Sequence, residues 1–248
     1  MDSKLTLSLS LPYYCHDRNE RLRPSAFMDL AQDVAVRGAD QLGFSDDKLS
    51  SSIDAVWVLA RMQFRYIRPL ARHEDITMET WHRGLNGLFF VRDYRLLGAD
   101  GEPSMLATSS WIVMDRTTRR MVRSDSLEIV DFTAQNTAFA IEEPAPKVAM
   151  PRGVQPEHLG DHVVSYSDID TNQHANNAKY IQWVMDVLPE SLTRDRAVSE
   201  VTINFNREAV PGEAVSLLHI ETPDGAHIVE GRASDQQVFI SKITFEQP

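Results

Sequence analysis

The sequence contains a single cysteine, no long apolar run and no excess of positive charge. Cys15 stands alone among 248 residues, which excludes an intrachain disulfide and a thiolate metal cluster and favours a reducing compartment. No segment reaches the roughly 18 apolar residues of a membrane span. The N-terminal LTLSLSL alternates leucine with polar residues, so it predicts a strand and not a signal peptide. We therefore expect a cytoplasmic protein without a membrane span.

Basic residues are outnumbered 25 to 36 by acidic ones, which leaves a formal net charge of −11. A general nucleic-acid binder needs a basic surface to release counterions from phosphates, so the net charge argues against this class. The motifs of phosphate loops and of Gly-x-Ser-x-Gly hydrolases are also missing. His158 and His162 are spaced like metal ligands, but Gly160 argues against a rigid helix between them. We expect neither a metal nor a cofactor.

Two halves of the chain show the same order of patterns. In each half, an apolar stripe at helical spacing precedes four segments with strand patterns. The first helix is expected to begin at Pro24 and end at Gly43, and the second to stop at Pro189. The strands are expected at 5–11, 55–67, 75–83, 88–98 and 104–115 in the first half, and at 162–170, 199–208, 214–222, 226–233 and 236–246 in the second.

The halves also align residue by residue. Placing Arg68 on Arg207 puts Glu74 on Glu213 without a gap, which indicates a tandem duplication. The expected fold class is α+β, with two tandem repeats in which an antiparallel sheet wraps around a long helix. We expect the first repeat at 1–132, a proline-containing linker at 133–160 and the second repeat at 161–248.

Polar side chains crowd the start of the second helix, in SYSDIDTNQHANNAKYIQW. One reading is helix capping, in which Asp170 or Asn172 accepts a backbone N–H. Capping accounts for only one or two of these residues. The other reading is chemical, because free N–H groups at a helix start can polarise a carbonyl oxygen. Asp170 and His174 are then suited to general-base or nucleophilic work, with Asn172 orienting one of them.

DIDTNQHANNAKYIQW resembles the active-site segment of the plant and bacterial acyl-ACP thioesterases, in which Asp-x-Asn-x-His precedes Asn-Asn-x-Lys-Tyr. The similarity extends through VWVLARMQFRY, METWHRGLNGLFFVRDYRL, ATSSWIVMDRTTRRM and INFNREAV. It implies a double hot-dog fold and the hydrolysis of fatty acyl chains from acyl carrier protein (ACP), which carries them on phosphopantetheine.

Carried over by position, the resemblance implies catalytic roles for Asp170, Asn172, His174 and Glu208. Strand alternation separately places Glu208 on the same face as Asn204 and away from Val201. The alternative for Glu208 is a solvated charge at the end of a strand. Where the plant enzymes often carry a cysteine this sequence has Ala209, so a thiol nucleophile is excluded there.

The first repeat shows no Asp-x-Asn-x-His in RNERLRPSAFMD, and the alignment puts Pro69 opposite Glu208. We therefore expect one active site per chain and an acyl pocket shaped by the first repeat. The pocket candidates, each of which is alternatively plain core, are Phe27, Met28, Leu30, Val34 and Trp57. The candidates for docking the acidic carrier, alternatively a solvated hairpin, are Arg116, Arg119, Arg120 and Arg123.

Three other functions compete with ACP-thioester hydrolysis. They are an acyl-CoA thioesterase on the same fold, a non-catalytic hot-dog protein that binds an acyl thioester, and a dehydratase. A pure binder has no need of the four implied catalytic residues, and a dehydratase does not carry this Asp-x-Asn-x-His segment. The sequence does not determine the acyl chain length. It also does not determine whether water or an enzyme group attacks the thioester, or whether the protein is a monomer or a homodimer.

Overall fold

The computed structural model describes residues 4–70, 73–124, 127 and 138–246. Contacts divide the chain into two compact units, one of residues 1–13 and 30–145 and one of residues 14–29 and 146–248. The sequence boundary expected between 132 and 133 falls outside the described residues. None of the helices in the described part is both long and apolar enough to cross a membrane.

The first unit is built on an antiparallel sheet in the order β1-β3-β4-β5-β2, with the short β6 paired to β5. All five strands expected in this half are confirmed. Their bounds are β1 Lys4–Ser10, β2 Ala55–Tyr66, β3 Asp75–Asn86, β4 Phe89–Leu97 and β5 Pro103–Asp115, and β6 covers Met121–Val122.

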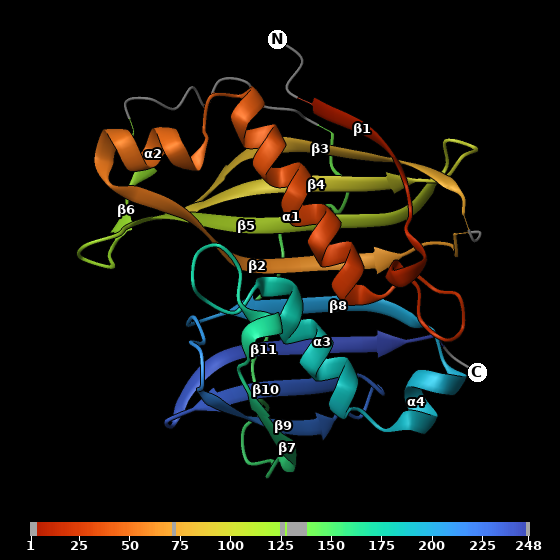
Figure 1. Ribbon diagram of the computed structural model, residues 1–248. Coiled ribbons are helices and arrows are strands. Elements are labelled where there is room, and N and C mark those ends of the chain that lie inside the picture. The colour runs from red at the N-terminus through yellow and green to blue at the C-terminus, as the bar shows by residue number, and fades with distance from the viewer. Residues whose placement is uncertain (1–3, 71–72, 125–126, 128–137, 247–248) are drawn as a thin grey trace. The chain divides into compact units, whose positions relative to one another are not determined.

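Helix α1 (Pro24–Gln41) is confirmed as the long helix of the first half, with 18 residues. Its residues from Leu30 onward belong to the first unit and lie across β3, β4 and β5 (Figure 1). Helix α2 (Asp46–Ile53) was not expected from the sequence. It is short and serine-rich, and it is held by its ends: the Ser45 side chain accepts the Lys48 N–H, and Asp54 ends the helix in a left-handed conformation.

The second unit repeats this topology, with the antiparallel order β8-β11-β10-β9-β7. Its strands are β7 Glu157–Val163, β8 Val198–Phe205, β9 Ala214–Glu221, β10 His227–Ala233 and β11 Gln236–Phe245, and its helices are α3 Asn177–Val187 and α4 Glu190–Asp195. Helix α3 ends just before Pro189, as expected. The overlaid arginine and glutamate pairs also recur as contacts, Arg68 with Glu74 at 3.9 Å and Arg207 with Glu213 at 2.6 Å.

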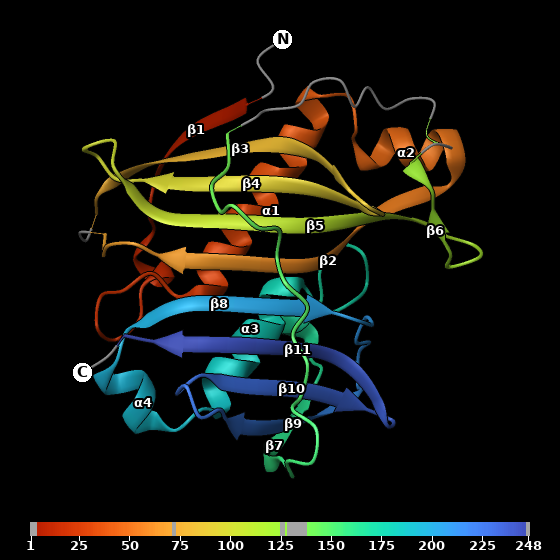
Figure 2. The ribbon, with the colours of Figure 1, turned by 180° about the vertical axis from the view of Figure 1, so that it is seen from behind.

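Two expectations about the middle of the chain were wrong. Strand β7 begins at Glu157, inside the expected linker, and the segment expected as a strand at 162–170 instead enters a 3₁₀ turn at Tyr166–Asp168. The polar residues there bond to one another locally, which competes with a strand ladder. The described linker residues that precede β7 run over the sheet face away from the helices (Figure 2). In the second unit, for example, Asn204 accepts the Val148 N–H at 2.7 Å.

Candidate active site

The loop before helix α3 is organised around the buried carboxylate of Asp168. Its Oδ2 accepts hydrogen bonds from the Ser165 N–H (2.8 Å), the Ser165 hydroxyl (3.0 Å) and His162 Nε2 (2.9 Å). Its Oδ1 accepts the indole N–H of Trp183 at 3.1 Å. Burial alone raises the pKa of this carboxyl, but the hydrogen bonds outweigh it and hold the pKa below its usual value. An ionised Asp168 therefore joins strand β7, the loop and helix α3.

The residues after Asp168 form a tight turn that carries three of the predicted catalytic side chains. Asp170 Oδ1 accepts the Asn172 N–H at 2.8 Å, and the Asp170 N–H donates to the His174 carbonyl at 3.0 Å. Gln173 takes a positive φ of 66° so that the chain can reverse. Asp170 and His174 thus close the turn through their backbones, and Asn172 is exposed at its tip.

His174 and Glu208 are brought together from different elements. His174 Nε2 lies 3.4 Å from Glu208 Oε2, and both side chains are about one-third exposed. The backbone next to each residue supplies the link, since the Ala175 N–H donates to the Ala209 carbonyl at 2.9 Å. The buried hydroxyl of Tyr180 accepts the Ala209 N–H at 2.9 Å. Helix α3 thereby holds the segment that presents Glu208.

Two predictions about this site were wrong in their geometry. Strand β8 ends at Phe205, so Glu208 lies in the loop beyond it and strand alternation does not apply. Asn204, expected on the same face, instead bonds the linker through Val148. The cap of α3 is Asn176, whose side chain accepts the Ala178 N–H, and neither Asp170 nor Asn172 caps the helix.

The first repeat contains a copy of the same turn, which the sequence comparison missed. Asp17 accepts the N–H groups of Asn19 at 2.8 Å and Arg21 at 2.9 Å, and its own N–H donates to the Arg21 carbonyl at 2.8 Å. The residue before Arg21 has φ 59°, the counterpart of the positive φ before His174. The aspartate and asparagine of the motif are therefore present, and an arginine occupies the place of the histidine. Starting the comparison at Asp17 would have revealed this.

The proposed pocket residues are buried to different degrees. Phe27, Met28 and Val34 have no exposed surface, whereas Leu30 and Trp57 are partly exposed. The Trp57 indole donates to the Phe44 carbonyl at 2.7 Å, which fixes that ring. These positions fit both a core and a pocket lining, so their contact with an acyl chain stays a prediction.

The four candidate docking arginines lie on and after the β5–β6 hairpin and are exposed. Asp115 shapes the hairpin by accepting the Thr118 N–H at 2.6 Å, and Arg119 takes a positive φ of 57° there. A tight turn therefore presents these charges to solvent. Their role in carrier binding stays a prediction.

Sequence reasoning also missed the residues that hold the site. His162 was weighed as a metal ligand beside His158, but it stacks on Trp183 at 4.2 Å and contacts Asp168. Among the described residues, no group of three or more His, Cys, Asp or Glu is arranged to hold a metal ion. Asp168 belongs to no motif, and Tyr180 is the last residue of the Asn-Asn-x-Lys-Tyr pattern, but no role was assigned to it. Their positioning roles follow from hydrogen bonds that form in the folded state.

Two family models match the chain. The model of the acyl-ACP thioesterase N-terminal domain matches residues 3–130, and that of the C-terminal domain matches residues 155–243. An oleoyl-acyl carrier protein thioesterase of Arabidopsis thaliana is 27% identical over 83% of this chain and 60% of its own length. A dodecanoyl-[acyl-carrier-protein] hydrolase of Cinnamomum camphora is 28% identical over 78% of this chain and 53% of its own. The chain thus spans little more than half the length of these curated relatives.

Solved structures share the fold over nearly the whole chain. An acyl-ACP thioesterase from Bacteroides thetaiotaomicron superposes with a TM-score of 0.87 at 23% identity and covers 98% of both chains. A 12:0-ACP thioesterase from Umbellularia californica gives a TM-score of 0.84 at 20% identity, with 98% of this chain and 97% of that one covered. The expected α+β fold with two hot-dog repeats is confirmed.

Proposed function

Because the chain belongs to the acyl-ACP thioesterase family, we propose that it hydrolyses fatty acyl-ACP thioesters to a free fatty acid and the carrier protein. This reaction ends fatty-acid elongation. The observation that carries the proposal is the approach of His174 Nε2 to Glu208 Oε2 at 3.4 Å beside the Asp170 turn. The site thus contains a proton acceptor in His174, a carboxylate partner for it in Glu208, and a second carboxylate in Asp170.

The roles follow from this arrangement. Glu208 orients the His174 imidazole and stabilises its cation, so that His174 takes a proton from water as the water attacks the thioester carbonyl. His174 then gives this proton to the phosphopantetheine sulfur as the C–S bond breaks, which leaves the free fatty acid and the carrier thiol. Asp170 lies in the same turn as His174 and supplies the second carboxylate of the site. It either assists the attack of water on the thioester carbonyl or attacks this carbonyl itself. Asn172, at the tip of the turn, positions the thioester.

The proposed partner is an acyl carrier protein in the cytoplasm. Carrier proteins are acidic, and this chain is itself acidic at −11, so a local cluster of positive charge is needed for association. The exposed arginines of the β5–β6 hairpin supply such a cluster. Coenzyme A presents the same phosphopantetheine arm without the protein surface, so an acyl-CoA thioesterase would not depend on these arginines.

The test measures thiol release from matched acyl-ACP and acyl-CoA substrates across chain lengths, for wild type, Asp170→Ala and His174→Ala. Each variant is expected to lose about a hundredfold to ten-thousandfold in kcat, because each lacks a group that reacts or moves a proton. An exposed Asp235→Asn variant serves as the control. Wild type that hydrolyses no thioester would reject the proposal in favour of a non-catalytic binder. A preference for acyl-CoA over acyl-ACP at every chain length would reject acyl carrier protein as the partner.

A further inference from the structure

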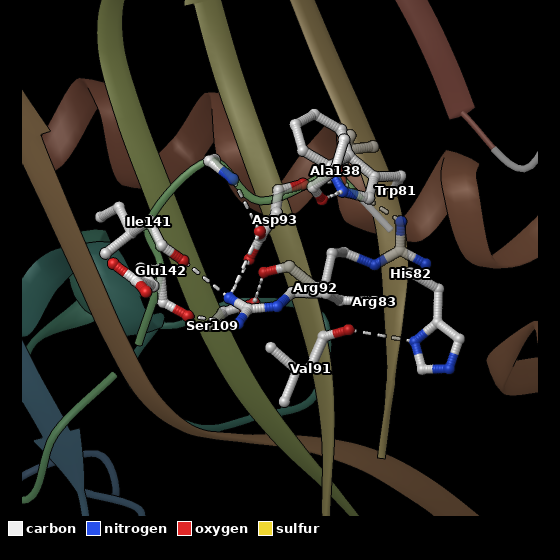
Figure 3. Close-up of polar contacts among 12 residues, drawn as sticks. Trp81, His82, Arg83, Val91, Arg92, Asp93, Ser109, Ala138, Ile141 and Glu142 are labelled. Atoms are coloured by element: carbon white, nitrogen blue, oxygen red, sulfur yellow. Dashed lines mark hydrogen bonds and ion pairs between the residues drawn. The ribbon is translucent and has the colours of Figure 1, made fainter. Parts of the chain in front are cut away.

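The sheet face that α1 covers in the first unit carries a buried arginine. Arg92 on β4 is 8% exposed, and it pairs in register with His82 on β3 and with Ser109 on β5. A Cβ atom on Gly38 of α1 would lie 2.6 Å from Arg92 Nη1, so the helix passes directly over the guanidinium. Figure 3 shows Arg92 and His82 on one side of the strands and Asp93 with Arg83 on the other.

The guanidinium of Arg92 has few acceptors in the described part of the chain. It donates through Nη1 to Thr80 Oγ1 at 3.3 Å, and it forms no ion pair with a carboxylate among the described residues. An arginine offers five N–H donors and stays charged in proteins. Burying such a charge without an anion costs several kcal/mol. The site therefore has unused capacity for a hydrogen-bond acceptor.

Arg83 makes the contrast clear on the opposite face of the same strands. Its guanidinium lies 3.5 Å from the wholly buried Asp93 and donates to the Ile141 carbonyl at 2.7 Å and to that of Glu142. Asp93 also accepts the Ala140 N–H at 2.9 Å (Figure 3). Arg83 thus attaches the linker to the sheet and has a carboxylate and two carbonyl groups as partners, whereas Arg92 has no such set of acceptors.

The polar groups around Arg92 are neutral. Burial, and next the charge of Arg92, lowers the pKa of His82 to about 4, and its Nδ1 lies 3.1 Å from the Val91 carbonyl. Burial raises the pKa of Tyr94, whose hydroxyl bonds Ser109 Oγ at 3.0 Å. Neither side chain supplies an anion near neutral pH. An anionic acceptor for the Arg92 guanidinium therefore has to come from a group other than His82 and Tyr94.

The position of Arg92 connects it with the expected acyl pocket. Gly38 lies one helical turn after Val34 on α1, so both residues face the same side. On the sheet, the Phe90 ring lies 4.8 Å from that of Trp57 and 6.3 Å from that of His82. Two pocket candidates, Val34 and Trp57, therefore border the layer that contains Arg92. A methyl group arriving there would leave the guanidinium unsatisfied, whereas an oxygen atom would accept its hydrogen bonds.

We propose that Arg92 recognises an oxygen-bearing group at or near the far end of the acyl chain, so that oxygenated acyl-ACP is preferred to the plain chain of the same length. The inference rests on the proposed function and names its substrate class. A terminal carboxylate is the strongest occupant, because it forms a charge-assisted and bidentate pair with arginine, and a terminal hydroxyl is the next.

The test compares kcat/KM of wild type for acyl-ACP pairs of equal length, with and without a terminal carboxylate or hydroxyl, across a series of lengths. At the length that reaches Arg92 we expect the carboxylate substrate to be favoured at least about tenfold, the equivalent of one charge-assisted hydrogen bond. Arg92→Met should abolish this preference and retain or improve hydrolysis of plain chains. Arg95→Met on the same strand, whose guanidinium lies over the Trp81 ring, is the matched control and should keep the preference.

The wild-type series decides the question even if Arg92→Met fails to fold. Plain chains favoured at every length, or a preference that persists in a folded Arg92→Met, would overturn the inference and leave the proposed function intact. Wild type that hydrolyses no acyl-ACP at all would instead reject the proposed function. Inhibition of wild type by free dicarboxylic acids more strongly than by monocarboxylic acids of equal length would support the site independently.

Discussion

His174 Nε2 stands 3.4 Å from Glu208 Oε2, although the two residues come from a loop before helix α3 and a loop after strand β8. A backbone hydrogen bond from Ala175 to Ala209 sets this approach. The contact is therefore determined by how the two loops are tied together.

Glu208→Gln is expected to lower kcat about a hundredfold or more with little change in KM. The amide keeps the shape of the side chain but loses the charge that stabilises a protonated His174. Steady-state kinetics on acyl-ACP check this, with the exposed Glu246→Gln as the control. A KM effect without a kcat effect would assign Glu208 to substrate binding.

Asp168→Asn is expected to lower the free energy of unfolding at pH 7 by about 1.5–3 kcal/mol, because an amide cannot accept all the donors around this carboxylate. The folded-state pKa of Asp168 is depressed, so its contribution is present above the unfolded-state pKa of about 3.9. That contribution disappears as the pH falls through the folded-state value.

Urea unfolding of wild type and Asp168→Asn at pH 7 and below pH 4 measures this difference. The gap between them should narrow in acid, and kcat should fall because the loop that carries His174 loosens. Asp235→Asn, an exposed change in a left-handed turn that asparagine tolerates, controls for charge. A difference in unfolding free energy that does not change with pH would contradict the conclusion that Asp168 is ionised in the folded protein.

Tyr180→Phe is expected to lower kcat about fivefold, the equivalent of one hydrogen bond of about 1 kcal/mol. Burial raises the pKa of Tyr180 to about 12, so its hydroxyl is neutral near pH 7 and accepts the Ala209 N–H. Without it, the segment that presents Glu208 is less firmly held. Tyr166→Phe in the preceding loop, where the side chain is 97% exposed, should change nothing. Equal effects of the two variants would exclude the positioning role.

Asp17→Ala is expected to destabilise the fold by about 1 kcal/mol, since it removes acceptors for two backbone N–H groups. The kcat measured well below the melting temperature should not change, because Arg21 replaces the histidine that this turn would need for proton transfer. Asp170→Ala, the equivalent change in the second repeat, should lower kcat about a hundredfold or more. Loss of kcat in Asp17→Ala would show that the first turn takes part in the reaction.

The double reversal Arg119→Glu and Arg120→Glu is expected to raise KM for acyl-ACP on the order of tenfold and to leave KM for acyl-CoA unchanged. The effect should shrink at high ionic strength, because exposed charges are screened. Arg152→Glu, an exposed reversal in the second unit, is the control. Equal changes for both carriers would reject the docking surface.

Local patterns in the sequence were sufficient to locate most of the strands, both long helices and the repetition of the two halves. The period of two in LTLSLSL and the stripe that begins after Pro24 are local properties of the chain, so β1 and α1 lie where they were expected. The alignment of Arg68 with Arg207 anticipated two repeats, and both units have the same strand order. The segment from Asp170 to His174 was found because its motif is contiguous.

Contacts between side chains that are distant in the sequence could not be predicted before the chain was seen folded. Strand alternation cannot place Glu208, because β8 ends before it. Its position depends instead on the hydrogen bond between Ala175 and Ala209, which joins two loops that are distant in the sequence. The importance of Asp168 depends on donors from Ser165, His162 and Trp183, which converge only after folding. The isolation of Arg92 likewise depends on a helix that packs over it at Gly38. Burial and long-range hydrogen bonds are properties of packed elements, and no local pattern in the sequence encodes them.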